Sequence, residues 1–232
     1  MGIRIRRSSS IPLNGTSPLI SFIKSAHPTC GANYHKVWST ILVTSSMKVS
    51  ATCALLSPIV AYIGIGLAIL QAPWFSWSRN ALSDLGASPE SAPYFNTALI
   101  IAGLLLIVFA LYLISRPMAL IRAAGVLLCA SSIALACIGV FPETVHPHHF
   151  IASVAFFIIT PFATAALAIA YRCNQKLSAS LGLAAILAFL VWFPPWPAIA
   201  VPELFSSLCD TIPLAYIALR CLKASEETGA LI

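Results

Sequence analysis

Side chains that could bind or react gather in three short segments of an otherwise apolar chain. The segments read PWFSWSRNALSDLGASPESAPYFN, FPETVHPHHF and FPPWPAIAVPEL. The candidate binding residues in and beside them are Arg79, Asn80, Ser83, Asp84, Asn96, His149, Ser153, Glu203 and Asp210. Arg and Asn side chains would hold phosphate or hydroxyl groups, and the carboxylates would orient a histidine. The set therefore predicts a polar pocket for a headgroup.

Two of these residues suit a reaction as well as binding. Asp84 and His149 have the side chains of a general base and its orienting partner. Together with a metal they would suit hydrolysis of a lipid bond. His146 and His149 are the candidate metal ligands because imidazole suits zinc. Pro147 breaks the helix between them and no H-E-x-x-H pair is present, so zinc is an alternative, no cofactor is assured, and catalysis stays open.

Residues 80–86, NALSDLG, form the most distinctive local run. Ser83 or Asp84 could cap a helical turn, and Gly86 would allow a positive φ. This local explanation does not account for Arg79 beside Asn80 and Asp84. A buried charge pair or a headgroup-binding patch would account for it.

A polar stripe follows one side of a predicted helix in the second half of the chain. Its members are His149, Ser153, Thr160 and Thr164, separated by four, seven and four residues, which is helical spacing. The simplest interpretation is a stripe that faces the bundle interior, where hydroxyl groups bond between helices. A transport path or a substrate cleft along the stripe is the alternative.

Asp210 lies inside an apolar window, seven residues after Glu203. This separation places it about 10 Å deeper along a helix. An ionised carboxylate in hydrocarbon costs about 2.5–3.5 kcal/mol, so Asp210 should face inward with a partner or be protonated. Glu203 follows Pro202, and a carboxylate in a first helical turn also favours the helix dipole. Both a functional and a structural role are therefore open for Glu203.

The elements that must position these groups are transmembrane helices. Hydrophobic residues make up 59% and charged residues 9% of the 232 residues, against about 45–50% and about 25% in soluble domains. This composition excludes a soluble domain and a disordered chain. A membrane-spanning helix needs about 20 apolar residues. Windows of this kind cover residues 51–70, 94–114, 119–140, 150–171, 177–193 and 202–219.

Basic residues orient the six windows. Cytoplasmic loops near helix ends collect Lys and Arg, and every second boundary here is basic. Beyond the N-terminal region, the boundary residues are Lys48, Arg116, Arg122, Arg172, Lys176, Arg220 and Lys223. Of 13 Lys and Arg residues, only Arg79 falls on the other side. We predict an all-α bundle of six transmembrane helices, a multi-pass protein of the cell membrane with both termini cytoplasmic.

Three regions follow from this division. Residues 1–47 are basic, rich in Ser and Thr and without apolar periodicity, so we expect a disordered tail. Met47 before Lys48 resembles a natural start, which would make the tail an over-called extension. Residues 48–222 form the expected six-span domain, and residues 223–232 a short cytoplasmic tail. Orientation explains the net charge of +6, and with no base-stacking or Gly-rich phosphate motif we expect neither nucleic acid nor nucleotide as a partner.

The polar segments, together with YFNTALIIAGLLLIVFALYL and GVFPETVHPHHFIASVAFF, resemble the archaeal and bacterial six-span family catalogued as domain of unknown function 998. The resemblance covers about residues 48–222 and implies a six-helix membrane fold without an established activity. A weaker similarity to the DRAM and Sfk group rests on Ser83, Asp84, Gly86 and His149. The zinc-dependent ceramidase and adiponectin-receptor superfamily is fainter still, since Ser153 stands where its H-x-x-x-H pattern needs a second histidine.

These observations favour one function and leave two alternatives. The preferred interpretation is a membrane protein that binds a lipid or its headgroup in a polar pocket at the extracytoplasmic face, with membrane lipids as partners. The first alternative is a metal-assisted lipid hydrolase. The second is a small proton-coupled transporter in which Asp210 and His149 relay protons, although no inverted repeat supports it.

Overall fold

The computed structural model describes residues 45–229 of the chain, which form a helical bundle without strands. The elements are α3 (Ser45–Leu70), the 3-10 helix η1 (Ser83–Gly86), α4 (Ala92–Ile114), α5 (Ala119–Val140), α6 (His148–Ala170), α7 (Gln175–Leu190) and α8 (Ala200–Gly229). The predicted all-α bundle is confirmed. The expected N-terminal tail lies outside the described residues except for residues 45–47, which open α3, and α8 extends through residues 223–229.

Five of the described helices are long and apolar enough to cross a membrane, whereas the sequence predicted six spans. The exception is α7, whose 16 residues reach about 24 Å, against a hydrocarbon core of about 30 Å. The predicted window continued to Phe193, but α7 ends at Leu190 and a turn leads into Pro194 and Pro195. Two consecutive prolines cannot continue a helix, because each lacks the amide hydrogen.

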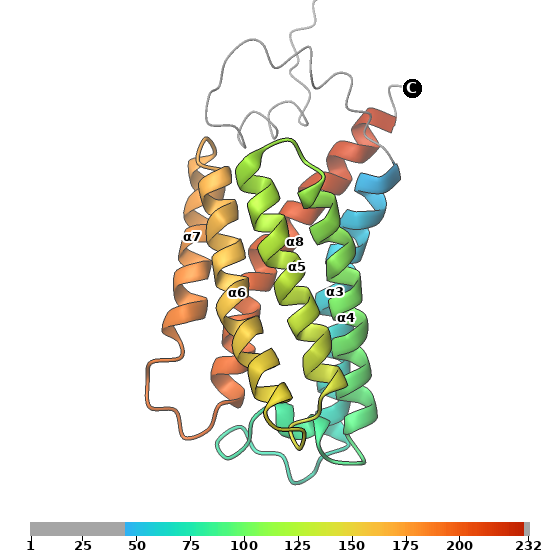
Figure 1. Cartoon of the computed structure of the whole chain (residues 1–232), viewed down its shortest axis with the longest axis vertical. Helices are drawn as coiled ribbons and strands as arrows, with labels where there is room; N and C mark the ends of the chain where they lie inside the picture. Colours follow the sequence, from blue (N-terminus) through green and yellow to red (C-terminus); the bar gives the residue numbers. More distant parts are fainter. Residues whose placement is uncertain (1–44, 230–232) are drawn as a thin grey trace, which may run out of the picture.

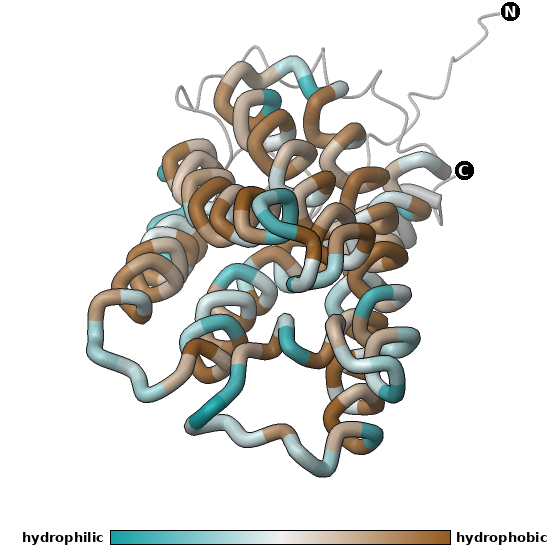
Figure 2. Tube along the Cα trace, turned by 60° about the horizontal axis from the view of Figure 1, so that its bottom comes forward, coloured by the Kyte–Doolittle hydropathy of each residue, from teal (hydrophilic) through white to brown (hydrophobic). Residues whose placement is uncertain are grey.

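The two ends of the bundle differ in charge. α3 begins and α8 ends at the upper end in Figure 1. This upper end, here called the basic end, carries Lys48, Arg116, Arg122, Arg172, Lys176 and Arg220. The opposite end carries η1, Glu143 and Glu203 and is called the acidic end. Figure 2 turns the acidic end forward and shows its connections mostly pale or teal, whereas the helices are mainly brown.

The helices pack as a closed ring. Each helix contacts the next along the chain, and α8 returns to pack against α3. α7 lies beside α6 and α8 (Figure 1). The outward faces carry large apolar side chains such as Leu104, which is 55% exposed, and apolar side chains on these faces suit a lipid solvent.

Glycine allows α4 and α5 to approach closely. A Cβ atom on Gly103 would lie 2.7 Å from the carbonyl oxygen of Ser132 and 2.8 Å from the amide nitrogen of Ala136. A Cβ on Gly139 would lie 2.5 Å from the carbonyl oxygen of Asn96. Because these neighbours are backbone atoms, they cannot rotate away. Small residues at helix contacts are typical of membrane bundles, where close van der Waals packing replaces the hydrophobic effect.

Candidate functional site

Asp84 organises the loop between α3 and α4. Its Oδ2 accepts hydrogen bonds from the Asn80 side-chain amide, at 2.8 Å, and from the backbone amide of Ala81, at 3.0 Å. The Asn80 Oδ1 in turn accepts a bond from the backbone amide of Ser76 at 3.0 Å. Short Asn and Asp side chains commonly close turns in this way. The residues Asn80 and Asp84, both predicted to belong to the site, therefore lie together.

Glu203 joins this loop to α8. It is 7% exposed, and one carboxylate oxygen accepts the backbone amide of Leu82 at 2.6 Å. The backbone amide of Ala200, the first residue of α8, donates to the Asn80 carbonyl at 3.2 Å. The beginning of α8 thus holds the loop from two sides. Ser83 and Asp84 directly follow Leu82, so Glu203 lies next to η1.

Glu143 completes a group of three carboxyl side chains. Ser83 donates its hydroxyl to Glu143 at 3.2 Å, and Asp84 and Glu143 are hydrogen bonded to each other, which requires a proton between them. Burial, and then the neighbouring Asp84, raise the pKa of Glu143 from 4.5 to about 7. We call Asp84, Glu143 and Glu203 the acidic cluster. Glu143 was missing from the predicted site, although it stands in one of the three polar segments.

Asn96 and Ser91 hold the other side of η1. The Asn96 side-chain amide donates to the carbonyl of Gly86 at 3.0 Å, and the Ser91 hydroxyl donates to the carbonyl of Leu85 at 2.7 Å. No described residue donates to the buried Oδ1 of Asn96. The expectation of a positive φ at Gly86 was wrong, because no described glycine has one. Glycine is needed there for space, since a Cβ would lie 2.5 Å from Asn96 Oδ1.

Arg79 takes no part in this arrangement. Its side chain is exposed, and within residues 45–229 neither a hydrogen bond nor an ion pair joins its guanidinium to another side chain. The buried charge pair that would explain Arg79 beside Asp84 is therefore absent from the described residues. The charge of the loop is consequently dominated by carboxylates.

His149 is buried, and its hydrogen-bond partners do not include Asp84. Its Nδ1 lies 2.7 Å from the carbonyl oxygen of Phe141, the residue that ends α5, and its Nε2 lies 3.3 Å from the Ser153 hydroxyl. Because a carbonyl can only accept, Nδ1 carries a proton and donates. His149 therefore caps the carboxyl end of α5, a role that favours a histidine side chain. The predicted pairing of Asp84 and His149 in catalysis is not formed.

The metal candidates do not form a ligand set. His146 is exposed, whereas His149 is buried and its two ring nitrogens lie against Phe141 and Ser153. Across residues 45–229, no three His, Cys, Asp or Glu side chains are grouped to hold a metal ion. A zinc site needs three or four such ligands, so the donors here do not fit zinc.

A cavity of about 120 Å³ runs inside the bundle from the acidic cluster toward the basic end. Ser83 and Glu203 line one end of the cavity, and Ala54 and Leu214 line the other. Glu203 and Leu214 are eleven residues apart on α8, a separation of about 16 Å. By the same measure of volume, a single water molecule needs only roughly 10–15 Å³. The cavity is therefore long enough to take an extended molecule.

The two sides of the cavity differ in polarity. The α4 and α5 side is apolar, with Phe95, Leu99, Leu106, Leu128, Leu135 and Ile138. The α6 and α8 side carries polar groups, among them Ser153, Thr160 and Thr164 of the predicted α6 stripe. Thr160 and Thr164 bond back to carbonyls one turn earlier. The stripe thus faces the bundle interior, and only His149 among its members does not line the cavity.

Asp210 lies in the cavity wall about midway along it. It is 6% exposed, and the Thr164 hydroxyl donates to its Oδ1 at 2.7 Å. Beside it, the Tyr62 hydroxyl lies 3.2 Å from those of Ser207 and Thr211. Asp210 thus faces inward with a partner, from α6 and not from His149. Tyr62 and Thr211 were not predicted: Tyr62 stands alone in an apolar window, and Thr211, directly after Asp210, was not singled out.

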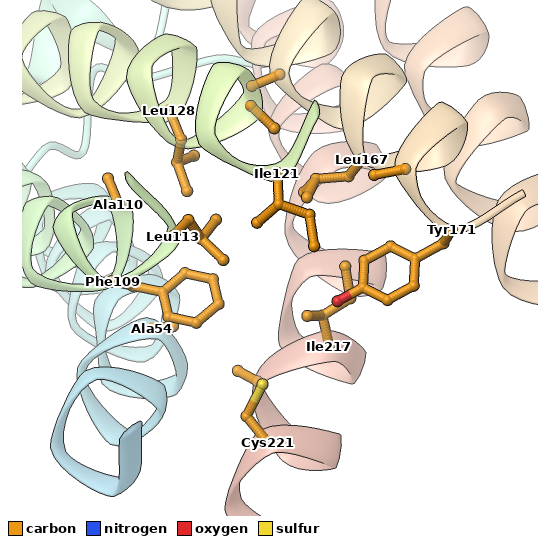
Figure 3. Packing of buried hydrophobic residues seen from close by; sticks show 14 of the residues in the cluster. Ala54, Phe109, Ala110, Leu113, Ile121, Leu128, Leu167, Tyr171, Ile217 and Cys221 are labelled. Atoms are coloured by element: carbon orange, nitrogen blue, oxygen red, sulfur yellow. The ribbon is translucent and has the colours of Figure 1, made fainter. Parts of the chain in front are cut away.

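The basic half of the bundle is filled by apolar side chains. Figure 3 shows Phe109, Leu113, Ile121, Tyr171 and Ile217 grouped between the helices. Each of these side chains is buried. This packing fills the interior toward the basic end, whereas the acidic cluster lies at the opposite end.

Comparison with known proteins identifies the family of this chain. No curated protein and no solved structure matches the chain. Residues 55–220, which include the acidic cluster and every lining residue of the cavity except Ala54, match the family model described as "Protein of unknown function (DUF998)". The match and the apolar helices identify an integral membrane protein, and the chain belongs to the DUF998 family.

Proposed function

We propose that the protein binds an amphiphilic lipid inside the bundle, with the lipid's polar end at the acidic cluster and its chain in the cavity. The observation that carries this proposal is the elongated cavity with one apolar and one polar side. Ligand sites for small molecules are typically concave and mostly apolar, with a few polar groups that fix orientation. A lipid with a single extended chain matches this distribution of side chains.

The charge difference between the two ends supports an orientation in the cell membrane. Basic residues near helix ends stay in the cytoplasm, which puts the basic end inside and the acidic cluster at the extracytoplasmic face. A lipid would then enter from the outer leaflet. The apolar packing around Phe109 and Ile217 supports a closed inner side.

A transporter is the second candidate, and Asp210 is the observation that favours it. A carboxyl group in the middle of a membrane-spanning segment is a common proton-relay element, and Asp210 lines the cavity. The hydrolase alternative gains no such support, since His149 bonds to Phe141 and Ser153 rather than to Asp84.

The proposal is tested by filling the cavity. Ala61 lines the cavity, so phenylalanine at this position would project into the space that a lipid chain needs. Ile63, on the same helix, is 58% exposed on the outer surface, and Ile63→Phe is the matched control. Both variants are purified in a neutral detergent, and retained lipid is measured by native mass spectrometry.

We expect Ala61→Phe to lower lipid occupancy about tenfold or more, since overpacking a site costs about 1–3 kcal/mol and 1.4 kcal/mol corresponds to tenfold in affinity. Ile63→Phe should retain the lipid of the unmodified protein. Equal lipid occupancy in the two variants would show that the lipid lies on the outer surface, and the proposal would fail.

A further inference from the structure

The walls of the cavity carry carboxyl side chains but no basic ones. Among the described lining residues are Glu203 and Asp210, and there is no Lys, Arg or His. Asp84 and Glu143 lie next to Glu203 and add to the same potential. Arg79, the basic residue at this end, is exposed and makes no side-chain hydrogen bond to the described residues of the cluster. An anionic headgroup would therefore find no basic partner in the cavity wall.

Glu203 and Asp210 each keep one oxygen available toward the cavity. Glu203 accepts the amide of Leu82 through one oxygen, and Asp210 accepts the hydroxyl of Thr164 through one oxygen. No described residue donates to the second oxygen of either carboxylate. Both side chains are more than nine-tenths buried and both line the cavity.

Neighbouring hydroxyl groups do not supply the missing donors. The Tyr62 hydroxyl donates to Ser207, and the Ser207 hydroxyl donates to the carbonyl of Leu204. A buried charge is stabilised only by a partner that comes with it into the low-dielectric interior. A ligand that brings its own positive donor supplies such a partner.

We infer that the amphiphile bound in this cavity is cationic, with an ammonium group held at Glu203 beside Ser83 and its chain extending past Asp210. This inference deepens the proposed function and rests on it. An N–H donor of a primary ammonium would bond to the second oxygen of Glu203, and the nearby Asp84–Glu143 pair, which shares one proton, adds to the attraction. Asp210, seven residues farther along α8, adds a second carboxyl group along the path.

The test uses three probes with the same chain: dodecylamine, dodecanol and dodecanoic acid. Near neutral pH these are cationic, neutral and anionic. Equimolar pairs compete for the full-length protein in neutral detergent micelles, and bound probe is counted by native mass spectrometry. Ala61→Phe, which fills the cavity, gives the background from surface binding.

We expect the unmodified protein to bind the amine at least about tenfold better than the acid. Glu203→Gln keeps an oxygen for Leu82 but removes the charge, and should cut this preference severalfold or more. Asp210→Asn keeps an oxygen for Thr164 and should reduce the preference by a smaller factor. Glu90→Gln, an exposed carboxylate at the same end, should leave it unchanged.

The outcomes separate the inference from the proposed function. If none of the three probes binds above the Ala61→Phe background, the proposed function itself fails. If the probes bind but the acid binds as well as the amine, the cavity is occupied and the inference is overturned. An amine preference that is the same in Glu203→Gln, Asp210→Asn and the unmodified protein would also overturn it.

Discussion

Replacing Glu203 by alanine is expected to release the loop that carries η1 and destabilise the protein. The Leu82 amide donates to this carboxylate at 2.6 Å, and the pair is buried. Removing the acceptor leaves the Leu82 amide without a partner, at a cost of about 1–3 kcal/mol. The carboxylate also lies in the first turn of α8, where interaction with the helix dipole contributes about 0.3–1 kcal/mol. Together these effects predict a loss of about 1–4 kcal/mol of unfolding free energy.

Glutamine at the same position separates the hydrogen bond from the charge. Glu203→Gln retains an oxygen that accepts the Leu82 amide, so its loss of unfolding free energy should be about 1 kcal/mol or less. Unfolding is measured by titrating SDS into mixed micelles and following tryptophan fluorescence. Glu90→Ala is the control, because Glu90 is exposed on the same loop, and it should unfold like the unmodified protein.

Comparing the two variants shows whether the acceptor oxygen of Glu203 anchors the loop. If Glu203→Ala and Glu203→Gln lose the same unfolding free energy, the acceptor oxygen does not anchor the loop. An alanine variant as stable as the unmodified protein would refute the account of the Leu82 contact altogether.

Three further predictions concern packing, protonation and capping. Gly103→Ala should cost about 1–3 kcal/mol, whereas Gly66→Ala, which meets no atom within 4 Å, should gain about 0.5–1 kcal/mol; SDS titration of both checks the difference. Because the folded protein holds the Glu143 proton up to about pH 7 and the unfolded chain releases it near pH 4.5, the unfolding free energy should fall as pH rises between these values. Glu143→Gln should show a shallower fall than the unmodified protein, and parallel pH profiles of the two proteins would contradict this prediction. His149→Ala should lose about 1–3 kcal/mol by orphaning the Phe141 carbonyl, and added zinc should shift the melting temperature of neither protein.

The helices could be predicted because charge is so rare in this chain. Arg116, Arg172 and Lys176 separate apolar windows, and Arg122 lies near the start of one. The predicted window of residues 119–140 coincides with α5. The shorter α7 could not be distinguished from a span by apolar content alone. Its length is limited by the turn before Pro194, which the window had included.

The contacts of the site were harder to predict, for two physical reasons. The helices are apolar on all sides, so periodicity separates inward from outward faces only where polar residues such as Thr160 and Thr164 mark one side. Partners also come from distant parts of the chain, as with Leu82 and Glu203. Local sequence could place Asp84 and Glu203 at the same end of the bundle, but it could not show that Glu143 joins them.

His149 illustrates how a correct location can lead to a wrong role. Its spacing from Ser153 correctly placed the side chain on one face of α6, and the two residues are in contact. The sequence did not show that the Phe141 carbonyl, at the end of α5, lies within 2.7 Å of the ring. The Nδ1 proton is therefore used in a capping contact that the local sequence did not indicate.

Photo-crosslinking tests the central claim, that an amphiphile lies inside the bundle, most directly. The probe is a long-chain alcohol that carries a diazirine on its chain, and the labelled residues are mapped by mass spectrometry. Leu135, Thr160 and Leu214 line the cavity on α5, α6 and α8. Each has an outward-facing neighbour two residues earlier, namely Ile133, Ile158 and Ile212. We predict that label appears on the cavity-lining residues and disappears with excess unlabelled alcohol, and label confined to the three outward-facing isoleucines would contradict the account.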